Sequence, residues 1–140
     1  MGCETDYDTD ILLWSEQQAE ALRRRSANSL DWENLAEEIE SLGRSQLHAV
    51  QSHLIQALLH DLKAEAWPLS RDVAHWRAEA RGHRSDAYRQ YTPSMRQRLD
   101  MAALYRDARR RMPDTMDGTL PLPIPADCPV TLDEMLDEGE

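Results

Sequence analysis

The stretch from Leu30 to Leu62 places the strongest constraint on how this chain can fold. Its apolar residues recur at intervals of three to five, which is the period of an α-helix rather than of a strand. The apolar surface widens after the middle of the stretch, so that half is expected to have neighbours on several sides. The periodic residues are Leu35, Ile39, Leu42, Leu47, Val50, Leu54, Leu58 and Leu62, with Ile55 and Leu59 in the wider part.

The signals at the two ends of this stretch also fit a helix. Asp31 is expected to cap the amino terminus, where the acidic residues that follow complement the helix dipole. Pro68 disfavours helical geometry at Trp67, so the helix is expected to end there. Gly43 leaves open whether the helix is continuous, bent or broken into two.

Three further segments have helical patterns. Residues Tyr7 to Arg25 are amphipathic, and a third helix is expected from Ser70 to about Tyr91. A fourth is expected from Ser94 to Met112, because proline suits the first turn of a helix. The breaks between the four helices are Asn28-Ser29, Trp67-Pro68 and Thr92-Pro93.

The chain changes character after residue 112. Leucine and isoleucine alternate with proline from Leu120 to Pro125, which favours an extended strap that covers the helices. Thr131 and Glu134 then form a capping box ahead of a short terminal helix. The sequence therefore predicts one all-α domain over residues 1–140. We expect an irregular four-helix bundle with its core at about residues 7–112 and the strap and short helix at about residues 113–138.

The net charge of −10 is distributed unevenly along the chain. Residues 1–40 carry eleven acids against three bases, and residues 113–140 carry eight acids and no bases. Residues 69–112 carry eleven arginines against five acids. Attraction between the acidic ends and the basic middle is the simpler interpretation. The alternative is a nucleic-acid surface, although such domains usually carry net positive charge; its arginines would be Arg96, Arg106, Arg110 and those of the third helix.

The rest of the composition predicts a cytoplasmic protein. Cys3 and Cys128 are too few and too far apart for a disulfide framework or a cysteine zinc site. The start of the chain lacks the apolar run of a signal peptide, and no stretch approaches the length of a membrane span.

One constellation could hold a metal ion. Asp72, His75, Glu79 and His83 follow one another at steps of three and four, so that neighbours lie one helical turn apart. Histidine and carboxylate ligands at this spacing suit zinc, iron or manganese. The arginines on the same helix offer the acids salt bridges instead, and a residue of the central helix such as His60 would have to complete the site.

The other titratable residues favour structural roles. His53 and His60 are one heptad apart on the central helix, about 10 Å along its axis, and are interpreted as hydrogen-bonded structural residues. Glu37, Glu38 and Glu40 are interpreted as a solvated face at the start of that helix. The sequence contains no nucleophile motif, phosphate-binding glycine loop or dinucleotide fingerprint.

Several segments resemble the domain of unknown function family 29, whose members are small helical proteins found mostly in bacteria. They include YDTDILLW, LDWENLAEEIESLGRS, HDLKAEAWPLSRDVAHWR and CPVTLDEMLDE, and together they extend from Tyr7 to Glu138. Asp61 departs from the pattern at a position that is usually apolar, and Met135 replaces a common leucine. The resemblance implies a helical fold, but no activity, ligand or catalytic residue.

We therefore expect a non-enzymatic module that binds another protein, with no cofactor; self-association into a homo-oligomer remains open. Acidic ends and an arginine-rich middle supply surfaces for electrostatic association. Two alternatives come from other classes. One is a nucleic-acid-associated protein that uses residues 69–112, and the other is a metal-dependent hydrolase in which a bound ion activates water.

Overall fold

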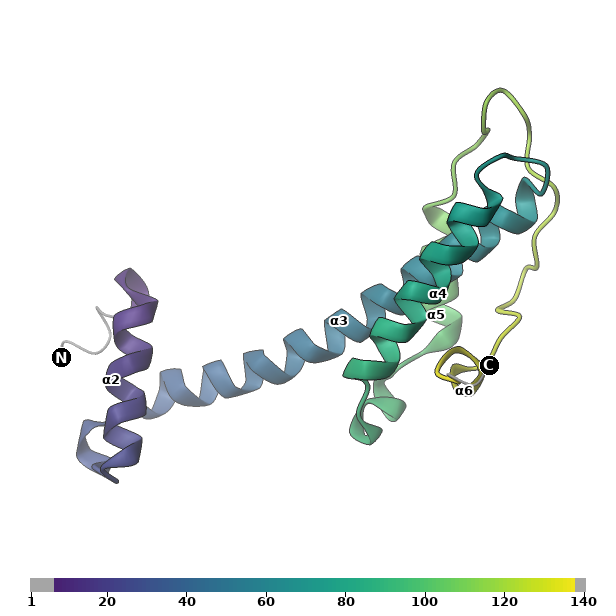
Figure 1. Cartoon of the computed structure of the whole chain (residues 1–140). Helices are drawn as coiled ribbons and strands as arrows, with labels where there is room; N and C mark the ends of the chain where they lie inside the picture. Colours follow the sequence, from purple (N-terminus) through teal and green to yellow (C-terminus); the bar gives the residue numbers. More distant parts are fainter. Residues whose placement is uncertain (1–6, 138–140) are drawn as a thin grey trace. The chain divides into compact units, whose positions relative to one another are not determined.

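The computed structural model describes residues 7–137 and confirms an all-α protein. Within these residues no strand forms, and an isolated β-bridge pairs Met116 with Thr119. The elements are α2 (Ile11–Arg23), η1 (Ala27–Ser29), α3 (Trp32–Ala66), α4 (Val73–Gln90), η2 (Pro93–Arg98), α5 (Met101–Arg110) and α6 (Leu132–Met135), where η denotes a 3₁₀ helix. The α-helices are labelled in Figure 1.

The chain divides into two compact units that share α3. The first ends at Ser45 and the second begins at Gln46. The expectation of a single domain stays a prediction.

In the first unit, α2 is joined to the start of α3 by hydrogen bonds. The indole nitrogen of Trp14 donates to Oδ2 of Asp31 over 3.0 Å, and the backbone N–H of Asp31 donates to Oε1 of Gln18 over 2.7 Å. Trp14 and Gln18 are both buried. Because Trp14 and Gln18 lie one turn apart on α2, both can reach Asp31, Trp14 at its carboxylate and Gln18 at its backbone N–H.

Asp31 begins α3 as the sequence predicted. Its carboxylate accepts hydrogen bonds from the side chain of Asn34 over 2.8 Å and from the backbone N–H of Asn34 over 3.5 Å. The bonds from Asn34 and Trp14 hold the pKa of Asp31 below its usual value, although desolvation opposes them.

A second link within the first unit joins Tyr7 to Glu38. The Tyr7 hydroxyl donates a hydrogen bond to the Glu38 carboxylate, which raises the pKa of Tyr7 to about 12.

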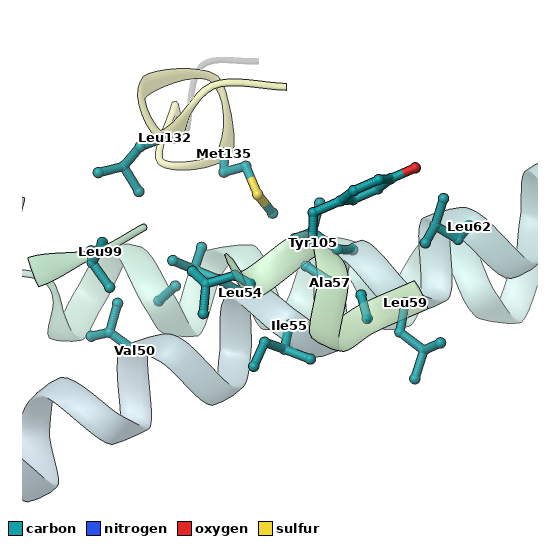
Figure 2. Close-up of a cluster of buried hydrophobic side chains, with 14 of the residues drawn as sticks. Val50, Leu54, Ile55, Ala57, Leu59, Leu62, Leu99, Tyr105, Leu132 and Met135 are labelled. Carbon is teal, nitrogen blue, oxygen red and sulfur yellow. The ribbon is translucent and has the colours of Figure 1, made fainter. Parts of the chain in front are cut away.

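The core of the second unit is built around the later half of α3, as the widening apolar surface predicted. Val50, Leu54 and Leu58 are buried there with Tyr105 of α5. Figure 2 shows Leu132 and Met135 of α6 pointing toward these side chains of α3 and α5. The short terminal helix therefore completes the core.

The proline-rich segment lies against the helices of the second unit through backbone hydrogen bonds. The indole of Trp67 donates to the carbonyl oxygen of Thr119 over 2.9 Å, and the N–H of Leu122 donates to the carbonyl oxygen of Ala66 over 2.9 Å. Further along, the hydroxyl of Tyr105 donates to the carbonyl oxygen of Pro125 over 2.6 Å. These bonds agree with a strap that docks on its own chain.

The predicted capping box of α6 is present. Oγ1 of Thr131 accepts from the N–H of Glu134 over 3.1 Å, and the Glu134 carboxylate accepts from the N–H of Thr131 over 2.8 Å. Because two terminal N–H groups gain partners, a helix of four residues can form at this point in the chain.

Two predicted boundaries are wrong. The helix expected from Ser94 to Met112 is divided, because Leu99 is extended and Asp100 caps a new helix by accepting from the N–H of Ala103. The third helix begins at Val73 rather than Ser70, since the residues after Pro68 form turns. In both cases a local hydrogen-bonded alternative replaces the first helical turn.

The helix α3 continues through Gly43, which settles the question that the sequence left open. A Cβ atom added there would meet nothing within 4 Å.

Replacing Gly43 by alanine is therefore expected to raise the free energy of unfolding by about 0.5–1 kcal/mol, because alanine loses less backbone entropy on folding. Urea denaturation measures the change. Gly82→Ala on α4, which has the same open surroundings, is the matched comparison, and a loss of stability in Gly43→Ala alone would contradict the expectation.

Candidate functional site

Two histidines meet where α3 and α4 pack in the second unit. Nδ1 of His53 lies 3.0 Å from Nδ1 of His83, and the two ring centroids are 5.2 Å apart. Both side chains are half-buried. At this distance one ring must donate and the other accept, so at least one of the two histidines is neutral.

A third imidazole lies next to this pair. The ring of His60 stacks on that of His83 with centroids 5.8 Å apart. Nδ1 of His60 lies 2.7 Å from the carbonyl oxygen of Gln56 and donates to it, so Nε2 of the neutral ring carries the lone pair. His60 has the hydrogen bond that the sequence analysis expected, while His53 is bonded to another histidine.

The surroundings of His83 favour its neutral form. Desolvation at the helix contact is the main cause that lowers its pKa, and the nearby imidazoles of His53 and His60 act in the same direction. Glu79 opposes the shift, because its Oε1 lies 3.9 Å from Nε2 of His83. The two nitrogens of His83 therefore face different groups: Nδ1 faces His53 and Nε2 faces a carboxylate.

Asp86 brings a carboxylate to the same place. One ligand atom from each of His53, His83 and Asp86 lies within 4.8 Å of the other two, and no other such trio occurs in residues 7–137. Arg89 donates to one carboxylate oxygen of Asp86. A carboxylate has two oxygens with several lone pairs, so this hydrogen bond does not exhaust its capacity.

Two of the four metal ligands predicted from sequence lie close to each other in the structure. Glu79 and His83 come together, as their spacing of four predicts. Asp72 lies just outside α4 with its backbone N–H bonded to Ser70, and His75 is exposed. Sequence reasoning did not single out Asp86, although its spacing of three from His83 is a signal for a shared face.

Asp61 joins α3 to α4. Its Oδ1 accepts from Arg77 over 2.8 Å and its Oδ2 from Arg84 over 2.7 Å. The Asp61 side chain is 26% exposed, so both ion pairs are partly shielded from water. A charged residue is accommodated at this partly buried position because α4 supplies two arginines.

Other arginines of the basic region also have carboxylate partners. Arg96 pairs with Asp133 next to α6, and Arg110 pairs with Asp107 within α5. The pair between Arg96 and Asp133 joins the basic middle to the acidic end of the chain, as the charge distribution predicted. These pairs neutralise part of the positive charge that a nucleic-acid surface would need.

The first unit exposes an apolar seam, which we define as Trp32, Leu35, Ile39 and Leu42 on α3. Their steps of three, four and three are those of the a and d positions of a coiled coil. Trp32, Ile39 and Leu42 are 64%, 68% and 64% exposed, and Leu35 is half-buried. The sequence predicted the stripe, but not that its first half would lack a covering partner within the described part of the first unit.

A surface hollow of about 480 Å³ lies where the strap passes the end of α3. Its lining is mainly apolar and includes Trp67, Leu69 and Leu120. It contains no cluster of titratable residues that would suggest a catalytic site.

Together these observations define a small helical protein with an exposed apolar seam and a histidine–carboxylate cluster. Residues 7–139 match the family described as Domain of unknown function DUF29, and the chain belongs to that family. Among curated proteins no match is found. No helix of the described chain is long and apolar enough to cross a membrane.

The chain is also similar to a solved structure, the crystal structure of an alpha-helical protein of unknown function from Rhodospirillum rubrum. The two share 28% sequence identity with a TM-score of 0.64. The similarity covers 94% of this chain and 89% of the other.

Proposed function

We propose that this protein is a non-enzymatic protein-interaction module whose apolar seam binds an amphipathic helix of another protein. The observation that carries the proposal is the exposure of Trp32, Ile39 and Leu42 at coiled-coil spacing. Large apolar side chains gathered on one helical face are typical of a binding surface, whereas single exposed leucines are ordinary. A helix with its own apolar residues at matching intervals would bury them.

The acidic charge around the seam suggests the chemistry of the partner. Glu38 lies at the position that flanks the seam, Glu33 and Glu40 lie further round α3, and Glu37 lies on the opposite face. The nearby base, Arg44, pairs with Glu37 over 3.4 Å. A partner helix with lysine or arginine beside its apolar residues would therefore be attracted. Two copies of the seam facing each other would instead bring like charges together, which favours a different protein as the partner.

The seam provides its own fluorescent reporter. Trp14, Trp67 and Trp76 are buried, whereas Trp32 is 64% exposed. Burial of Trp32 by a bound helix should shift the emission to shorter wavelength, while the other three tryptophans change little.

Titration with two synthetic helical peptides tests the proposal. Both carry leucine at the a and d positions; one has lysine and arginine at the flanking positions and the other has glutamate. We expect a saturable blue shift with the basic peptide and binding at least about tenfold weaker with the acidic one, a difference of about 1.4 kcal/mol. The variant Ile39→Asp/Leu42→Asp should lose at least about tenfold in affinity for the basic peptide, because it places charge in the contact.

Leu120→Asp is the control, since Leu120 is 73% exposed but belongs to the second unit; its affinity should match that of the unchanged protein. Equal affinity for both peptides would refute the charge argument. A reversible dimer in sedimentation that Ile39→Asp/Leu42→Asp abolishes would identify a second copy as the occupant instead. A DNA or RNA mobility shift that disappears with added salt would favour the nucleic-acid alternative.

A further inference from the structure

We propose that His53, His83 and Asp86 bind a divalent transition-metal ion of the zinc class across the contact of α3 with α4. This site lies in the second unit and does not depend on the apolar seam. One ligand atom from each of the three residues lies within 4.8 Å of the other two. All three side chains are half-buried, so an ion there would be partly shielded yet reachable from solvent.

The distances fit a tetrahedral ion. Zinc binds histidine nitrogen at about 2.0–2.1 Å, so two ligands at the tetrahedral angle lie about 3.3 Å apart. The Nδ1 atoms of His53 and His83 are 3.0 Å apart, close to this separation. One ligand atom of Asp86 lies within 4.8 Å of one from each histidine, so the carboxylate has to move closer to complete the site.

A second group supports the ion from outside. With Nδ1 of His83 on the metal, its Nε2 carries the proton and faces Oε1 of Glu79 at 3.9 Å, so the Glu79 carboxylate has to move closer to accept a hydrogen bond from it. Histidines that bind metals usually donate their other N–H to a carboxylate or carbonyl oxygen, which orients the ring. The pair of Glu79 and His83, which the sequence suggested as two ligands, is thus reassigned as one ligand and its orienting partner.

The donor set selects the class of ion. Two imidazoles and one carboxylate suit zinc and its neighbours, whereas calcium and magnesium prefer oxygen ligands alone. Three protein ligands leave a fourth position for water or for a small anion. Arg89 holds one oxygen of Asp86 and thereby orients the carboxylate.

Metal binding by the full chain, purified without a histidine tag, tests the site. Cobalt(II) serves as the spectroscopic probe, and zinc is measured by competition with a chromophoric chelator. We expect one ion per chain, with the intense visible absorption of tetrahedral cobalt, and a rise in Tm on addition of zinc. His53→Gln/His83→Gln should weaken binding at least about 100-fold, and Glu79→Gln by about 10–100-fold.

His75→Ala is the matched control, because His75 lies on α4 but is exposed and outside the trio; it should bind as the unchanged chain does. Circular dichroism verifies that each variant is folded, and Asp86→Asn replaces the double variant if that one does not fold. Loss of the ion in His75→Ala but not in His53→Gln/His83→Gln would overturn the assignment in favour of the α4 face alone. Failure of the unchanged chain to bind cobalt or zinc would overturn it altogether.

Discussion

The double variant Leu132→Ala/Met135→Ala is expected to lose about 4–6 kcal/mol of unfolding free energy, measured by urea denaturation of the second unit. Leu132 and Met135 are only 8% and 3% exposed, and they pack against α3 and α5. Truncation of a buried leucine or methionine to alanine costs about 2–5 kcal/mol, since apolar contacts are lost and a cavity remains. Domains of ordinary stability have about 5–15 kcal/mol in total, so this loss is a large fraction of the free energy of unfolding.

Leu120→Ala in the strap is the control for this variant. Its side chain is 73% exposed, and surface truncations of this kind usually change stability by about 0.5 kcal/mol or less. A double variant as stable as Leu120→Ala would mean that α6 does not seal the core. The m-value should be followed as well, because detachment of α6 before the main transition would make unfolding depart from two states.

Replacing Asp61 by alanine is expected to lower the free energy of unfolding by about 1–2 kcal/mol. The change removes two charge-assisted hydrogen bonds, each of which can contribute about 1.5–3 kcal/mol in a buried setting. Arg77 and Arg84 are 43% and 31% exposed, so water solvates them once Asp61 is gone, and the loss should fall well below the sum. Thermal and urea unfolding of the same samples measure the effect.

Two matched variants sharpen this experiment. Asp61→Asn keeps an acceptor without the charge and should lose less stability than Asp61→Ala. Glu65→Ala, one turn further along α3 at an exposed position, removes a charge without these partners and should be nearly neutral. If Glu65→Ala and Asp61→Ala are equally stable, the bridge between α3 and α4 contributes nothing measurable.

The predictable part of the fold was the part set by periodicity along the chain. The stripe from Val50 to Leu62 identified the core helix, and the capping box at Thr131 placed α6 correctly. Each of these signals is local, because the residues that make it up are close together in the sequence. The division at Asp100 was missed, since aspartate within an apolar stripe is compatible with both a helix interior and a cap. The exposure of Ile39 depends on which segments pack beside it, which periodicity does not report.

The candidate metal cluster illustrates the same limit. Spacing along one helix brought Glu79 and His83 together correctly, because residues four apart share a face. The sequence suggested His60 as the residue of the other helix, whereas the nitrogen within hydrogen-bond distance of His83 belongs to His53. The choice between them requires the register of α3 against α4, which depends on the packing of whole surfaces and not on spacing along one helix.

The docked strap has a consequence for biosynthesis. Trp67 bonds to a residue 52 positions later in the chain, and Leu132 and Met135 come later still, whereas Tyr7 and Glu38 are 31 positions apart. Chains emerge from the ribosome at about 5–20 residues per second. The first unit can therefore assemble before the strap and α6, which pack on the apolar side of Val50 to Leu62, have been synthesised. During those seconds that side is open to chaperones and to other nascent chains, and closure over such long sequence separations is intrinsically slow.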